Sequence, residues 1–227
     1  MTEIAQLRGP VLVTGTDTGV GKTIVTAAVA AVAGDAGARV AVVKLAQTGP
    51  DDDARTVALL AAPPTVRTLV SYPDPLAPLT AARTAGLPPL PAASATLAVR
   101  ELAAEHDLVL IEGAGGLLVP MGVSPGSDHP WTVADLAVTL RAPALVVVRP
   151  DLGTLNHTAL TVEALHRRGV ECHLVIGSWP PDLQLVHRTN LDDLAAIGDM
   201  VGAVPEDAAK LPPDEFRTAA PTWFTVG

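Results

Sequence analysis

The chain has 227 residues, of which 48% are hydrophobic and only 3% aromatic, and its formal net charge at pH 7 is −9. This length allows a sizeable buried core and indicates one domain over residues 1–227, with residues 1–9 as a short N-terminal tail. The acidic balance argues against nucleic-acid binding, and no apolar run approaches the roughly 20 residues of a membrane span. The single cysteine, Cys172, cannot form an internal disulfide, which favours a cytoplasmic location.

A glycine-rich loop follows the first apolar run. Residues 11–14 are predicted as a strand and residues 23–33 as a helix, and the chain between them reads Gly15-Thr16-Asp17-Thr18-Gly19-Val20-Gly21-Lys22-Thr23. Glycines let backbone N–H groups turn around an anion, and a helix N-terminus adds partial positive charge. Lys22 is expected to reach terminal phosphates and the Thr23 hydroxyl to bind Mg2+. An ordinary glycine turn is the alternative, since the strict motif has a glycine where Thr16 stands, but the strand and helix on either side favour a phosphate-binding loop.

The second predicted strand, residues 40–45, ends with a lysine. Lys44 could snorkel to the surface, or it could face the ligand-binding edge of a parallel sheet together with Lys22. Three adjacent acids, Asp51, Asp52 and Asp53, follow it. They form either an exposed loop that caps a helix predicted over residues 54–61 or the source of an Mg2+ ligand, and the sequence leaves both interpretations open.

The middle of the chain carries another acidic signal. Residues 63–91 are proline-rich and are predicted to be irregular apart from a short helix at 80–85, and a longer helix is predicted over 92–106. A strand predicted at 108–111 ends in Glu112-Gly113-Ala114-Gly115-Gly116. An acid at such a strand end commonly holds Mg2+ in phosphate-loop enzymes. The alternative is a capping or turn carboxylate.

The second half of the chain supplies the remaining elements. Residues 122–130 are predicted as a polar loop, residues 133–140 as a helix and residues 144–148 as a strand. A further helix begins within 151–157 and reaches about residue 168, with Thr154 as its predicted N-cap and free N–H groups that could hold a carboxylate. Two further strands are predicted at 172–176 and 200–204. The first is closed by residues 177–180 and the second ends within residues 202–207, and we expect these two segments to be the walls of a nucleotide-base site.

Strands that alternate with helices predict an α/β fold. Because the core must be built from Val, Leu, Ile and Ala, the strands are expected to be parallel and buried on both faces. The sequence therefore predicts three layers, a mostly parallel sheet flanked by helices, of the phosphate-loop NTPase type.

Four motifs resemble, in the same order, those of the dethiobiotin synthetase family: residues 15–23, Lys44-Leu45-Ala46-Gln47-Thr48-Gly49, residues 112–116 and Gly153-Thr154-Leu155-Asn156-His157. The resemblance covers most of the chain up to Ser178. It implies a homodimeric, Mg2+-dependent ligase of biotin biosynthesis that uses 7,8-diaminopelargonate, CO2 and ATP or another nucleoside triphosphate. One substrate amine becomes a carbamate, the γ-phosphate activates it, and the second amine closes the ureido ring of dethiobiotin.

The resemblance also implies roles for individual residues. Lys22 and Lys44 are the implied catalytic residues, and Thr23, Asp53 and Glu112 are the implied Mg2+ ligands. The implied nucleotide-binding residues are Gly19, Val20, Gly21, Lys22, Thr23, Ile24, Asp53, Glu112, Gly113, Ala114, Gly115, Gly177, Ser178, Pro205, Glu206 and Asp207. The implied substrate-binding residues are Thr16, Thr48, Gly115, Gly153, Thr154, Leu155 and Asn156. The last four are implied to bind the substrate carboxylate at a helix N-terminus, across the dimer interface.

The chain departs from the family pattern at three places. Leu45 stands where proline is common, Asp52 could replace Asp53 as the metal ligand, and Gly177-Ser178 stands where many members use an asparagine to read adenine, which leaves the base preference open. The main rival function is a partitioning or switch-type phosphate-loop ATPase, but the signature lysine of that group is absent from the loop. An amidotransferase-like synthetase is a second rival, and Cys172 is a poor candidate for its nucleophile.

Overall fold

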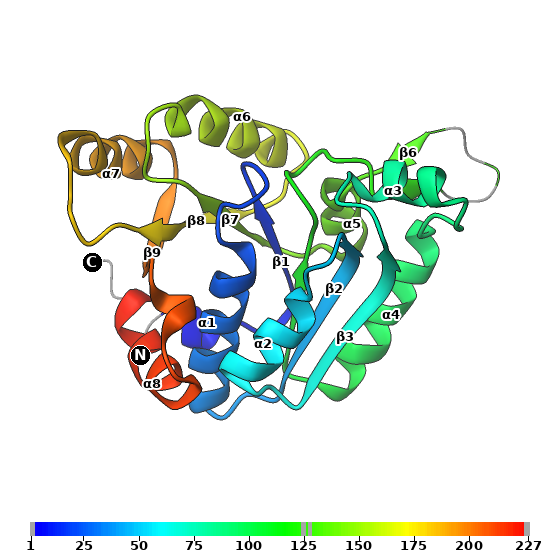
Figure 1. The fold of residues 1–227 in the computed structure, drawn as a ribbon, viewed down its shortest axis with the longest axis horizontal. Coiled ribbons are helices and arrows are strands. Elements are labelled where there is room, and N and C mark those ends of the chain that lie inside the picture. The colour runs from blue at the N-terminus through cyan, green and yellow to red at the C-terminus, as the bar shows by residue number, and fades with distance from the viewer. Residues whose placement is uncertain (1–2, 124–125, 127–128, 225–227) are drawn as a thin grey trace.

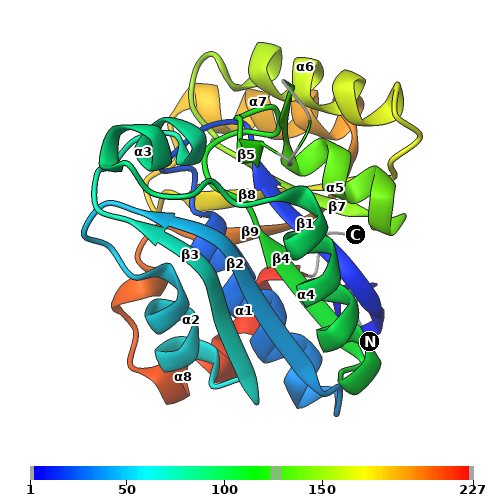
Figure 2. The same cartoon turned by 90° about the vertical axis from the view of Figure 1, so that its right-hand side faces the viewer.

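A computed structural model describes residues 3–123, 126 and 129–224. Within these residues the main sheet has seven parallel strands in the order β3-β2-β4-β1-β7-β8-β9 (Figures 1 and 2). Its strands are β1 (Gly9–Gly15), β2 (Val40–Thr48), β3 (Thr65–Tyr72), β4 (Leu108–Glu112), β7 (Ala144–Val148), β8 (Cys172–Trp179) and β9 (Asp199–Pro205). The short strands β5 (Gly122–Val123) and β6 (Pro130–Trp131) form a separate antiparallel pair.

Helices cover both faces of the main sheet, as the sequence predicts. One face carries α1 (Lys22–Asp35), α2 (Asp53–Ala61) and α8 (Pro213–Ala219). The other carries α3 (Pro78–Ala85), α4 (Ala92–Glu105), α5 (Val133–Leu140), α6 (Thr154–His166) and α7 (Leu185–Ile197). Short 3-10 helices span Glu3–Gln6, Ala208–Lys210 and Ala220–Phe224.

The core consists of two apolar layers that share the same strands. On β1, Leu12 packs into one layer, whereas Val11 and Val13 pack into the other. Successive strand residues point to opposite faces, so a strand buried on both faces is apolar along its length except where it carries a site residue such as Glu112. All residues of β4 and β7 are buried accordingly.

The strand order brings separate motifs to one edge. The chain leaves the central strand β1 through α1 towards β2, whereas β7 pairs with β1 on its other side, so the crevice beyond the carboxyl ends of these strands is the usual place for a ligand. The register pairs Glu112 at the end of β4 with Lys44 on β2 and with Val13 on β1. Two of the sequence-predicted site residues are therefore neighbours on adjacent strands.

Several sequence-based expectations need correction. The region 63–91, predicted to be irregular, contains the edge strand β3, whose residues are mostly half-buried. The expected tail at residues 1–9 includes a 3-10 helix that buries Ile4 and Ala5 against the core, and β1 already begins at Gly9. The predicted loop 122–130 carries β5 and β6 at its two ends, and its residues 124, 125, 127 and 128 lie outside the described residues.

Candidate functional site

The phosphate-binding loop connects β1 to α1 as the sequence predicts. Gly19 and Gly21 have φ angles of 71° and 99°, a backbone conformation that favours glycine. Gly21 is the N-cap of α1, and a Cβ atom there would clash with the carbonyl oxygen of Gly177 at the end of β8. The loop therefore lies against β8 in a backbone contact that requires glycine both at position 21 and at position 177.

Lys22 occupies the first turn of α1 and is almost fully buried. Its Nζ donates a hydrogen bond to the carbonyl oxygen of Asp17 at 2.8 Å, so the side chain folds back over its own loop. Burial, and then the positive charge of Lys44, lower the pKa of Lys22 from its ordinary value of 10.5 to about 8. A phosphate anion near Nζ would favour the ammonium and so counteract this lowering of the pKa.

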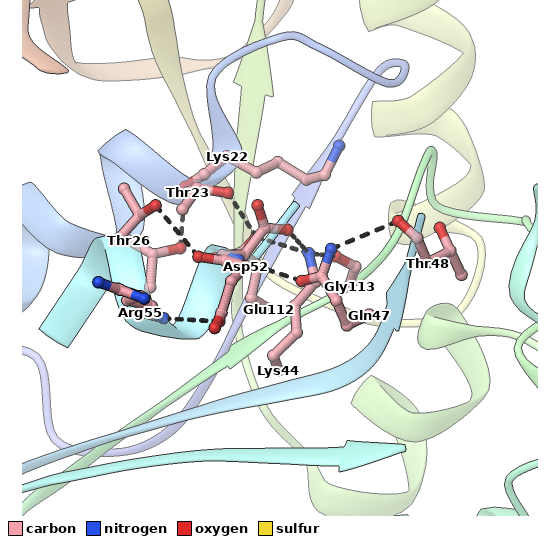
Figure 3. Close-up of polar contacts among 12 residues, drawn as sticks. Lys22, Thr23, Thr26, Lys44, Gln47, Thr48, Asp52, Arg55, Glu112 and Gly113 are labelled. Carbon is pink, nitrogen blue, oxygen red and sulfur yellow. Dashed lines mark hydrogen bonds and ion pairs between the residues drawn. The ribbon is translucent and has the colours of Figure 1, made fainter. Parts of the chain in front are cut away.

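Lys44 lies at the centre of a cluster of oxygen atoms (Figure 3). Its Nζ forms ion pairs with Asp53 and, at 2.8 Å, with Glu112, and it donates to the carbonyl oxygen of Gly113 at 3.1 Å. The Thr23 hydroxyl donates to the same Glu112 Oε1 at 2.9 Å. Burial alone would lower the pKa of Lys44, but the two carboxylates outweigh it and raise that pKa above its ordinary value. Lys44 does not snorkel to the surface, because its side chain is only 6% exposed.

The three adjacent aspartates separate into different environments. The Asp52 side chain accepts a hydrogen bond from the backbone N–H of Arg55 and caps α2, whereas Asp53 turns towards Lys44. Gln47 Oε1 accepts the N–H of Asp53 at 3.1 Å and so fixes the start of the helix. The structure therefore shows Asp52 as the cap of α2 and Asp53 beside Lys44, whereas the assignment of Asp53 as an Mg2+ ligand stays a prediction.

A cavity of about 380 Å3 opens above this cluster. It is lined by most of the residues predicted for phosphate, metal and substrate binding: Gly19, Gly21, Lys22, Thr23, Ile24, Lys44, Thr48, Asp53, Glu112, Ala114 and Gly115. The hydroxyl of Thr23 and the carboxylates of Asp53 and Glu112 are hard oxygen donors, the ligand type that Mg2+ prefers, so the residues present fit this metal.

The predicted walls of the base site lie beside the phosphate-binding loop. A neighbouring cavity of about 270 Å3 is lined by Val20, Ser178 and Glu206. Gly177 faces the loop backbone, since a Cβ atom there would clash with the carbonyl oxygen of Val20, and Pro205 and Asp207 lie at and just beyond the end of β9. Two residues that the sequence did not single out, Arg149 and His187, also line this cavity.

The N-terminus of α6 borders a third cavity, of about 110 Å3, lined by Thr16, Gly153 and Thr154 among others. The predicted N-cap was wrong by one residue. Gly153, with a φ of 95°, is the N-cap, and Thr154 is the first helical residue, its buried hydroxyl 3.5 Å from that of Thr158. Leu155 and Asn156 follow in the first turn.

Arg149 connects two of these cavities and was missed because a lone arginine after a strand carries no motif. Its Nη2 donates to the carbonyl oxygen of Thr18 in the phosphate-binding loop at 2.7 Å, and the residue lines both the 270 Å3 and the 110 Å3 cavities. Sequence spacing could not have found this contact, because it joins residues that lie 131 positions apart.

A larger cavity of about 590 Å3 lies elsewhere, between the C-terminal ends of α1 and α2 and helix α8. Among the residues that line it are Ala30, Ala61 and Arg217, and it includes none of the described residues that were predicted for the site. Size alone therefore does not identify the functional cavity. The helices over residues 3–123 and 129–224 are all too short or too polar to cross a membrane.

The comparisons with known proteins agree with the geometry. A family model described as an AAA domain matches residues 10–212. A relative from Saccharopolyspora erythraea is 54% identical over 88% of this chain and 89% of its own length, and one from Streptomyces coelicolor is 53% identical over 95% and 92%. Both are named ATP-dependent dethiobiotin synthetase BioD, as is a relative from Rhodococcus jostii that is 51% identical over 94% of this chain and 93% of its own length.

Solved structures support the same fold. The cell division ATPase MinD of Pyrococcus furiosus has a TM-score of 0.57 at 18% identity and covers 95% of this chain and 98% of its own. A ParA family ATPase of Chlorobium tepidum has a TM-score of 0.55 at 12% identity, covering 94% and 93%. At these identities the likeness concerns the fold alone and does not favour the switch-ATPase reading. Because full-length relatives about half identical to it share one name, the chain belongs to the family of ATP-dependent dethiobiotin synthetases.

Proposed function

We propose that the chain forms dethiobiotin from 7,8-diaminopelargonate and CO2 at the expense of ATP or another nucleoside triphosphate. The observation that carries this proposal is the buried Lys44 ammonium, held by Glu112 and Asp53 beside the phosphate-binding loop. A cation fixed at this point can neutralise an anion that forms between the diamine and the γ-phosphate. A simple phosphate-loop hydrolase would need no second buried lysine on β2.

The reaction needs positioning and charge neutralisation more than a strong nucleophile. One substrate amine adds to CO2 and loses a proton to give a carbamate. A carbamate oxygen then takes the γ-phosphoryl group, which releases the nucleoside diphosphate. The second amine attacks the carbonyl carbon, phosphate leaves, a proton is lost, and the ureido ring closes. In this proposal Lys44 stabilises the carbamate, Lys22 follows the charge on the transferring phosphoryl group, and Thr48 contacts the diamine.

Thr23, Asp53 and Glu112 are the residues that would hold Mg2+. When bound there, Mg2+ supplies neutralisation of the phosphate charge. Lys44 shares both carboxylates with that site. The position of its ammonium therefore depends on how much negative charge Asp53 and Glu112 can still offer it.

The substrate carboxylate is proposed to bind at the N-terminus of α6, where free N–H groups and the helix dipole favour an anion. The notion of a homodimer that brings this helix end to the partner's site is supported by Leu152, which is 91% exposed directly before Gly153. Leu118 and Leu160 are 50% and 58% exposed and add apolar surface. The lone Cys172 supports a cytoplasmic enzyme.

The base of the nucleotide is proposed to occupy the cavity next to Val20, Ser178 and Glu206. Ser178 and the backbone of Gly177 replace the asparagine that many family members use for adenine. The proposal therefore covers other nucleoside triphosphates as well as ATP.

The test is phosphate release from Mg2+-ATP with bicarbonate, measured with and without 7,8-diaminopelargonate, and identification of the product by mass. We expect release that depends on the diamine and yields dethiobiotin. If ATP gives no release, CTP and GTP are tried next. No phosphate release with any of the three nucleotides, or hydrolysis at the same rate with and without the diamine, would contradict the proposed function.

A further inference from the structure

The loop from Arg149 to Gly153 joins β7 to α6 and lies between the phosphate-binding loop and helix α7. On one side, Arg149 holds the carbonyl oxygen of Thr18. On the other side, α7 packs beside α6 (Figure 1) and sends two buried polar side chains, His187 and Asn190, into the loop. No sequence motif marks these two residues, and the reaction described above gives them no role beyond the place of His187 in the lining of the proposed base cavity.

Asn190 is tied to the loop backbone. Its Nδ2 donates to the carbonyl oxygen of Pro150 at 2.8 Å and to that of Asp151 at 3.0 Å. The Asp151 carbonyl also accepts the N–H of Thr154, the first residue of α6, at 3.2 Å. One side chain from α7 therefore supports the turn from which α6 begins.

His187 is tied to a side chain of the same loop. Its Nδ1 accepts the backbone N–H of Gln184 at 3.1 Å, which leaves Nε2 as the ring nitrogen that can donate. That Nε2–H donates to Asp151 Oδ1 at 3.3 Å. Asp151 is thus held through both its carboxylate and its carbonyl, whereas the next residue, Leu152, is 91% exposed.

We propose that His187 and Asn190 are positioning residues that hold the Arg149–Gly153 loop in the conformation in which the N-terminus of α6 can receive the substrate carboxylate. The inference rests on the proposed function of that helix end. Hydrogen bonds from two buried side chains fix the loop before the ligand binds. Binding therefore does not have to include the entropic cost of ordering the loop. In the proposed reaction the amines react beside the Lys44 ammonium and not at this helix end, so the chemical step does not depend on this support.

The first test uses Asn190→Leu, which keeps the approximate size of the side chain and removes both donors. We expect KM for 7,8-diaminopelargonate to rise about tenfold, because binding must then order the loop. The turnover number and the affinity for Mg2+-nucleotide should stay within about threefold of wild type. Arg188→Ala, which truncates an exposed side chain of the same helix, is the matched control and should leave both parameters unchanged.

KM separates this role from a loss of folded protein, because KM does not depend on enzyme concentration, whereas the apparent turnover number does. An Asn190→Leu enzyme with a lower turnover number and an unchanged KM would overturn the proposal. A second test is the cycle of His187→Ala, Asp151→Ala and the double variant. The Asp151 side chain is 64% exposed, so its removal should not prevent folding. Equal KM values in all three variants are expected, whereas additive effects would contradict the link.

Hydrogen exchange gives a readout that does not need the reaction. The amides of residues 151–156 should exchange faster in Asn190→Leu than in Arg188→Ala, since the turn loses its support. Unchanged exchange would show that Asn190 does not hold the loop in place. Faster exchange with an unchanged KM would show that holding the loop does not assist substrate binding. A wild-type protein that makes no dethiobiotin would instead contradict the function on which the inference rests, whatever the exchange rates are.

Discussion

Lys44 is a buried cation shared by two carboxylates, Asp53 and Glu112. We expect Lys44→Ala to lower turnover at least about a hundredfold, because the fixed charge that faces the developing anion is lost. Nucleotide affinity should stay within about tenfold, or roughly 1.4 kcal/mol, since Lys22 and the loop N–H groups remain. Steady-state phosphate release and equilibrium nucleotide binding measure the two effects.

Thermal unfolding serves as the control for Lys44→Ala, because the variant leaves Glu112 uncompensated in the interior. A folded variant with wild-type turnover would remove Lys44 from the mechanism.

Lys22 makes nucleotide binding depend on pH. Its pKa in the folded protein, about 8, lies below the ordinary 10.5, so between these values the unfolded chain binds more protons. This residue's contribution to stability therefore rises as the pH increases through that window. A bound polyphosphate favours the charged ammonium and raises the pKa again. We expect binding at pH 8 to take up about half a proton through Lys22, and none through it at pH 6.5, where it is already charged.

Calorimetric titrations in two buffers with different ionisation enthalpies measure this uptake. Protons released by the nucleotide's own phosphates have the opposite sign, so the two sources can be told apart. Binding heats that do not depend on the buffer at pH 8 would contradict a lowered pKa for Lys22.

At the scale of the element, α1 carries two glycines at its boundaries with opposite expected behaviour. Gly21, with its φ of 99°, touches the backbone of Gly177, so Gly21→Ala should destabilise the protein by about 1–3 kcal/mol or more and weaken nucleotide binding. Gly34 lies within the exposed last turn of the helix, and nothing would touch a Cβ atom there. Gly34→Ala should therefore stabilise by up to about 1 kcal/mol. Urea unfolding of both variants measures the contrast, and equal effects would contradict the role assigned to the close contact with β8.

The elements that sequence could predict are those whose pattern follows from burial on both faces. The apolar runs of β4, β7 and β2 were found because these strands are buried on both faces and are apolar up to the site residues near their carboxyl ends. Strand β3 was missed because it is an edge strand between prolines, and its half-exposed residues show no continuous apolar run. Helix α7 was not predicted either, since its buried residues include His187 and Asn190, which a hydrophobic pattern does not count.

The candidate site divides along the same line. Lys22, Lys44 and Glu112 could be predicted because each stands at a strand end or loop where little but ligand chemistry explains it. Arg149 and His187 could not, because their significance lies in contacts with residues 131 and 36 positions away. Such partners depend on the strand order, in which β1 lies between β4 and β7, and local sequence does not encode that order.

At the scale of the molecule, the two apolar layers are joined by strands that contribute to both. Leu12 and Val13 are consecutive residues of β1 and belong to opposite layers. Neither layer can come apart without exposing the other side of the same strands, so we propose that residues 1–227 form one cooperative domain. Two of the three tryptophans report on the layers separately, since Trp131 lies in one and Trp223 in the other.

Single-tryptophan variants test this cooperativity directly. One retains Trp131 and the other retains Trp223, with phenylalanine at the remaining tryptophan positions. Each variant is unfolded in urea and followed by fluorescence and by far-ultraviolet circular dichroism, so the comparison is made within one protein and is unaffected by differences in stability between variants. In a single domain the fluorescence midpoint equals the dichroism midpoint in both variants, because losing either layer removes the sheet that supports the other. A Trp223 signal that changes at lower urea than the dichroism would mean that the layer containing α8 unfolds independently, and the single-domain proposal would then be wrong.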